Sequence, residues 1–196
     1  MLNDTGLTVG ADQDARISVT TATSAVTIAN QTSNANLVFQ VNVAGTPTTA
    51  MTIFGANGVI SGTQINANYA DVAERFAADM TYTPGTVVEL GGVAEITKSI
   101  EELSENVFGV VSTRAAYLMN SGAGTDETHP PIAMTGRVPV RVTGTISKGD
   151  RLVSAGHGLA RAARPGEATA FNVIGRALES RTDTSEGTVE AIVTIN

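Results

Sequence analysis

Hydrophobic and polar residues alternate in three short runs near the N-terminus of this chain of 196 residues. These runs are RISVT at residues 16–20, AVTI at 25–28 and NLVFQVN at 36–42. A period of two with β-branched residues predicts strands, each with one buried face. Asn57-Gly58, between the runs 51–54 and 59–60, predicts a tight hairpin.

A denser series of apolar runs follows from about residue 81 to the C-terminus. Pro84-Gly85 predicts a turn, and residues 86–90 and 93–97 predict a hairpin around Gly91-Gly92. Further β-type runs occupy residues 107–112, 116–119, 132–134, 138–142, 151–153, 171–178 and 187–195. Many short strands with Gly-rich turns are typical of an all-β domain, either a compact β-barrel or a β-sandwich. Residues 100–105 fit a helical turn or an acidic loop, and Pro139 belongs at a sheet edge or a bulge.

Charge divides the chain into two regions. The first 68 residues carry only four charged side chains, which are Asp4, Asp12, Asp14 and Arg16. Their strands are short and include only two Phe, so this region has difficulty burying enough apolar surface alone. Association of equivalent strands from several chains would supply that burial, and an ordinary small β-domain is the alternative. Disorder is disfavoured, because low charge with recurring β-branched alternation is not its usual signature.

We therefore predict a short, intertwined, β-rich stalk-like oligomerisation region at residues 1–66 and a compact all-β domain at residues 67–196.

Composition narrows the function classes. The net charge of −7 argues against nucleic acid as a partner, because phosphate binding requires a basic face. The chain has no Cys, which excludes disulfides, thiolate catalysis and Cys-based zinc sites. No apolar run approaches the roughly 18 residues of a membrane span, so we expect no membrane insertion. The N-terminal residues also lack the basic start and apolar stretch of a signal peptide.

The candidate catalytic residues have no specific spacing. His129 lies in a long loop at residues 121–131 and His157 in a Gly-flanked turn, so both are expected as ordinary loop residues. Ser121, His129 and Asp126 could be drawn as a triad, but only geometry identifies one. No phosphate-binding glycine loop occurs, and acid pairs such as Asp71 and Glu74 are expected as surface charge. We expect no enzymatic activity, cofactor or metal.

The loop at residues 121–131 is a candidate contact surface. It combines Gly and Pro with Asp126, Glu127 and His129, and we expect these three side chains to be exposed.

The segment NYADVAERF at residues 68–76 joins the two regions. Tyr69, Val72 and Phe76 fall on one side at helical spacing, which predicts one or two helical turns or else an extended linker. The simplest interpretation is a packed hinge. The functional alternative is an interface between chains formed by Tyr69, Val72, Arg75 and Phe76, with Arg75 paired to an acid of a neighbouring subunit.

Several motifs in fixed order carry a resemblance to a known family. YADVAERF at 69–76 precedes YTPGTVVELGG at 82–92, VFGVVST at 107–113, AYLMN at 116–120, GRVPVRV at 136–142, KGDRLV at 148–153 and IGRALE at 174–179. Together they resemble the C-terminal module of phage tail-fibre and related virion structural proteins, from about Tyr69 to the C-terminus.

This resemblance implies a β-rich homotrimer located in the virion, as a short fibre or tail-tip component. Its implied partners are other virion proteins and a host surface receptor or glycan. Two alternatives remain open: a capsid decoration (cement) protein, and a self-cleaving C-terminal fibre chaperone.

Overall fold

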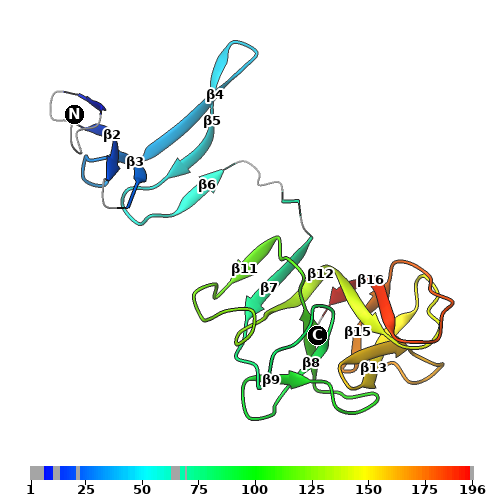
Figure 1. The fold of residues 1–196 in the computed structure, drawn as a ribbon. Coiled ribbons are helices and arrows are strands. Elements are labelled where there is room, and N and C mark those ends of the chain that lie inside the picture. The colour runs from blue at the N-terminus through cyan, green and yellow to red at the C-terminus, as the bar shows by residue number, and fades with distance from the viewer. Residues whose placement is uncertain (1–6, 11–13, 21–22, 63–66, 69, 195–196) are drawn as a thin grey trace. The chain divides into compact units, whose positions relative to one another are not determined.

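The computed structural model describes residues 7–10, 14–20, 23–62, 67–68 and 70–194, and the chain divides into two compact units, Met1–Asn66 and Ala67–Asn196. Every regular element of the described residues is a β-strand, which confirms the all-β class (Figure 1). None of the described residues forms a helix that could span a membrane.

The first unit contains two antiparallel sheets of three strands. Their strands are β1 (Leu7–Val9), β2 (Ala15–Thr20) and β3 (Ala25–Asn30) in one sheet, and β4 (Leu37–Val43), β5 (Thr46–Ile53) and β6 (Ile60–Gly62) in the other. Ile53 pairs with Ile60, which confirms the hairpin predicted around Asn57-Gly58. Gly58 has a φ of 71°, a conformation that glycine adopts without steric cost.

The strands of the first unit do not have the buried faces that the alternation predicted. Every described apolar side chain of this unit is exposed or half-buried, and the buried apolar core begins only at Ala73. The prediction of strands was right and the prediction of a buried face within the chain was wrong. The physical reason is that the two small sheets carry no covering layer from the described residues of their own unit.

The second unit is built around a closed five-stranded β-barrel. Its strands are β12 (Pro131–Val142), β13 (Arg151–Gly156), β14 (Leu159–Ala162), β15 (Val173–Ala177) and β16 (Gly187–Thr194). They pair in the order β14-β13-β15-β16-β12, and the ring closes where Val142 pairs with Ala160. Alternate residues of β12 and β16 point inward and fill the core, including Val138, Val140, Val142, Val189, Ala191 and Val193. The barrel alternative is therefore the observed one.

Five further strands extend this sheet. They are β7 (Asp71–Arg75), β8 (Val87–Leu90), β9 (Ile96–Lys98), β10 (Val107–Val111) and β11 (Tyr117–Met119). β10 joins β12 to the β8–β9 hairpin, while β7 pairs with β12 on one side and with β11 on the other. Residues 100–105 form a loop, in which Leu103 N–H donates to the Ser154 carbonyl.

The segment before the compact domain is a strand and not a helix. Asp71 and Ala73 are buried while Val72 is half-buried, which is the two-residue period of β7. β7 pairs with β12 from Asp71 to Arg75, so the backbone hydrogen bonds of this segment go to a neighbouring strand. The helical alternative for this segment was wrong, because β12 offers its edge as a partner.

Pro139 lies where one edge of β12 has no paired strand. It sits opposite Glu190, whose backbone N–H donates to Glu179 Oε1. On its other edge, β12 pairs with β7 only as far as Gly136 and with β14 only at Val142. The missing N–H of Pro139 therefore costs no ladder hydrogen bond, which is the environment expected for proline in a sheet.

Candidate functional site

Arg75 ties the loop at residues 121–131 to strand β7 of the same chain. Its Nη2 lies 2.7 Å from Asp126 Oδ1, and its Nη1 donates to the His129 carbonyl at 2.6 Å. Asn120 closes the other end of the loop, since its Nδ2 donates to the Arg75 carbonyl at 3.1 Å. The structure thus joins Arg75, which the sequence suggested for an interface between chains, to Asp126 and His129, which it suggested for an exposed contact loop.

The predicted interface residues are used mainly inside the chain. Arg75 is 14% exposed, and its acidic partner Asp126 belongs to its own chain rather than to a neighbouring subunit. Phe76 packs edge-to-face on Phe108, with ring centroids 4.9 Å apart. Val72 is half-buried, and Tyr69 lies outside the described residues.

The loop still presents acidic side chains to solvent. Asp126 and Glu127 are exposed, while His129 is half-buried. A hydrogen bond from Thr125 lowers the pKa of the Glu127 carboxyl, which keeps this exposed group charged. The imidazole Nδ1 of His129 lies 3.1 Å from Thr128 Oγ1, so its hydrogen-bonding hydroxyl is that of Thr128 and not that of Ser121. The hydrogen bond with Thr128 and the ion pair between Asp126 and Arg75 therefore take the place of a Ser121–His129–Asp126 arrangement.

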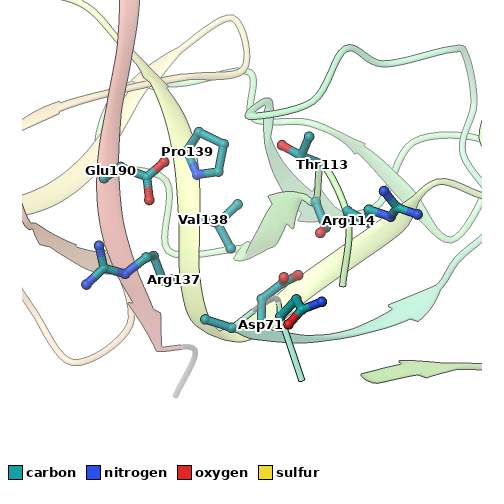
Figure 2. Close-up of a pocket in the computed structure, with 10 residues that line it drawn as sticks. Asp71, Thr113, Arg114, Arg137, Val138, Pro139 and Glu190 are labelled. Carbon is teal, nitrogen blue, oxygen red and sulfur yellow. The ribbon is translucent and has the colours of Figure 1, made fainter. Parts of the chain in front are cut away.

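A pocket of about 310 Å³ opens beside the start of β7 (Figure 2). It is lined by Asn68, Ala70, Asp71, Ser112, Thr113, Arg114, Arg137, Val138, Pro139 and Glu190. Asp71 and Ser112 are each 3% exposed, and neither Asp71 Oδ2 nor Ser112 Oγ has a hydrogen-bond partner among the described residues. Buried polar atoms are usually paired, so two unpaired oxygens on residues that line one pocket make this pocket a candidate site.

Sequence reasoning missed this pocket. Asp71 was expected as surface charge, and its burial corrects that expectation. Ser112 follows β10 and is distant from Asp71 in the sequence, so no local motif links the two. Among the described residues, no three His, Asp or Glu side chains gather in an arrangement that could hold a metal ion.

The first unit presents a second candidate surface, the exposed apolar face of the β2–β3 hairpin. Ile17 pairs with Ile28 and Val19 with Val26, so these four side chains share one face of the hairpin. They are 46%, 54%, 52% and 68% exposed in that order. We call these four residues the hairpin face.

No protein-family model and no curated protein sequence matches this chain. It is similar in structure to the protein described as "Crystal structure of the pre-mature bacteriophage phi29 gene product 12", with a TM-score of 0.54 and 16% sequence identity. The similarity covers 76% of this chain and 24% of that chain, so the matched part spans about a quarter of the length of the phage protein. At this level of identity, the likeness shows a shared fold.

Proposed function

We propose that this chain is a non-catalytic structural component of a phage virion and works as a homotrimer, in a short fibre or a tail tip. One observation carries the proposal: the first unit has regular strands, yet none of its described apolar side chains is buried. Sheets of this kind are stable when another layer covers them, and identical copies arranged around an axis provide one. The shared fold with a bacteriophage protein supports the virion assignment.

The hairpin face is the surface that we assign to contact between copies. Complete burial of a Val or Ile side chain is worth about 1.5–3 kcal/mol, so burying the exposed half of each gives about 1 kcal/mol per side chain. Four such side chains per chain then contribute roughly 12 kcal/mol to a trimer at that rate. This free energy is comparable to the stability of a small folded domain.

Sedimentation equilibrium of a matched pair of variants tests this assignment. Ile17→Ser with Ile28→Ser removes the central pair of the hairpin face, and we expect the trimer to dissociate at concentrations where the natural chain stays assembled. Thr27→Ser is the control, because Thr27 lies in the same hairpin and its strand neighbours Val26 and Ile28 point to the opposite face. An unchanged mass for the double variant would contradict the assignment.

The virion assignment has its own test. Antibodies against the chain should label the tail or fibre region of purified phage particles in electron micrographs. Labelling over the whole capsid would favour the decoration-protein alternative, and particles without label would contradict a virion role. In the same assembly, we propose that the exposed carboxylates of Asp126 and Glu127 contact a host receptor or glycan, which a glycan array with Asp126→Asn and Glu127→Gln variants checks.

A self-cleaving chaperone is the second candidate. It is favoured by the unpaired oxygens of Asp71 and Ser112, because Asp71 follows closely in sequence on the boundary at Asn66. In this reaction water adds across a backbone peptide bond near Asp71. The Asp71 carboxylate takes a proton from the water and delivers it to the leaving nitrogen. The word "pre-mature" in the description of the similar phage protein fits a processed product. A single intact mass after prolonged incubation would exclude this candidate.

A further inference from the structure

We propose that the pocket beside β7 binds a protonated primary amine, with Asp71 and Ser112 as the residues that hold its nitrogen. Asp71 and Ser112 line this pocket, and Asp71 Oδ2 and Ser112 Oγ are buried without a partner among the described residues. A buried carboxylate oxygen without a partner is costly, and a donor with a positive charge offsets that cost best. An ammonium group has three N–H donors, so it can donate to more than one oxygen.

The charged residues that line the pocket are two acids, Asp71 and Glu190, and two arginines, Arg114 and Arg137. Of these four side chains, only Asp71 is buried with an unpaired oxygen, so a cation is needed next to Asp71. Figure 2 shows that the guanidinium groups of Arg114 and Arg137 point away from Asp71, toward opposite sides of the view.

The walls of the pocket favour an amine on a short apolar stem. Val138 and Pro139 line one side, and they provide apolar surface for the carbon atoms next to the nitrogen. A pocket of about 310 Å³ accepts a side chain or a single sugar ring but not a large molecule. A lysine side chain and an amino sugar share this chemistry, and the probes below separate them.

A metal ion fits the pocket less well. Calcium is usually bound by six to eight oxygen ligands, and the described residues show no cluster of three or more acids or histidines. The chain's own peptide bond before Asp71 is also a poor occupant, because the Ala70 carbonyl already accepts from Arg137 N–H at 3.3 Å within the β7–β12 ladder. An external amine is the occupant that leaves this ladder intact.

Ligand-observed saturation-transfer NMR on the full chain tests the proposal. The probes are propylammonium chloride, Nα-acetyl-lysine amide and glucosamine, with 1-propanol and N-acetylglucosamine as uncharged counterparts. We expect propylammonium and one of the two larger amines to bind, and the uncharged counterparts not to bind. The larger amine that binds identifies the source of the ligand. Equal binding of 1-propanol and propylammonium would overturn the proposal, as would no binding by any amine.

Substitutions locate the binding. Asp71→Asn keeps the shape of the side chain and removes its charge, and we expect at least about tenfold weaker binding of propylammonium. Glu101→Gln is the control, since it removes the same charge from an exposed residue that does not line the pocket, and it should leave binding unchanged. Ser112→Ala provides an independent variant in case Asp71→Asn does not fold, and we expect a severalfold loss. Equal affinity in the pocket variants and the natural chain would refute the site.

Two further outcomes would replace the proposal. Tight binding of calcium in place of the amine would assign the pocket to a metal ion. Cleavage of the chain next to Asp71, abolished in Asp71→Asn, would assign the two oxygens to the self-cleavage reaction. Neither outcome bears on the trimer, because the hairpin face belongs to the other unit.

Discussion

Replacing Arg75 with Ala tests whether this residue holds its own chain together or joins two chains. Its ion pair reaches Asp126, whose side chain is 72% exposed, so solvent screening limits the pair to about 0.2–1 kcal/mol. Its hydrogen bond to the His129 carbonyl is made by a charged donor on a side chain that is only 14% exposed. Such a bond is worth about 1.5–3 kcal/mol. We therefore expect Arg75→Ala to destabilise the compact unit by about 2 kcal/mol, most of it from the hydrogen bond.

The assay is thermal unfolding by calorimetry, with Asp126→Asn as the matched variant. For a domain of this size, about 2 kcal/mol lowers Tm by roughly 6–8 °C. Asp126→Asn removes only the exposed partner, so its Tm should fall by less than about half of that. The loop should also become more sensitive to protease in Arg75→Ala, because its anchor is gone. Equal effects of the two variants would refute the ranking of the two contacts.

The same variant decides between the two roles of Arg75. If its contacts are internal, Arg75→Ala should keep the oligomeric mass of the natural chain at temperatures well below Tm. Dissociation at such a temperature, without loss of secondary structure, would contradict the internal role and restore the interface hypothesis.

Two other predictions concern the compact unit. Burial, and next the hydrogen bond to Asp79, raise the pKa of Tyr82 above its ordinary value of 10.0. Since the folded chain holds this proton more tightly than the unfolded chain, the contribution to stability is complete below pH 10.0 and is lost as pH rises through the raised pKa. Tyr82→Phe should therefore show a weaker loss of Tm in alkaline solution, and parallel pH curves would contradict this. Gly136→Ala should cost several kcal/mol, roughly 3 or more, because its φ is 112° and a Cβ would lie 2.1 Å from the Ala70 carbonyl oxygen. Gly144→Ala, with a φ of 78° and no atom within 4 Å of its Cβ, should cost only about 1 kcal/mol in urea unfolding.

The sequence predicted the strands well because their signals are local. The alternation at residues 25–28 and the Asn57-Gly58 turn depend only on neighbouring residues, and both are found in β3 and in the β5–β6 hairpin. The closure of the barrel was not predictable in this way. It depends on a pairing between Val142 and Ala160, which no short pattern encodes.

Errors arose where distant residues decide the local structure. The spacing of Val72 and Phe76 fits a helix, but pairing with β12 made the segment a strand. The loop at residues 121–131 was expected to be exposed, but its attachment to Arg75 through Asp126 and the His129 carbonyl was not predicted. The pocket combines residues of β7, β12 and β16 with the segment that follows β10, so its two unpaired oxygens become visible only in three dimensions.

The exposed apolar side chains of the first unit are the basis of the proposed assembly, and the mass of the intact chain in solution tests it most directly. Light scattering at micromolar and lower concentrations should give three times the 20.1 kDa of one chain. Limited proteolysis should show that the region 1–66 is protected at the concentrations where this mass is observed. A stable mass of 20.1 kDa, with the first unit folded and protease-resistant, would contradict the account.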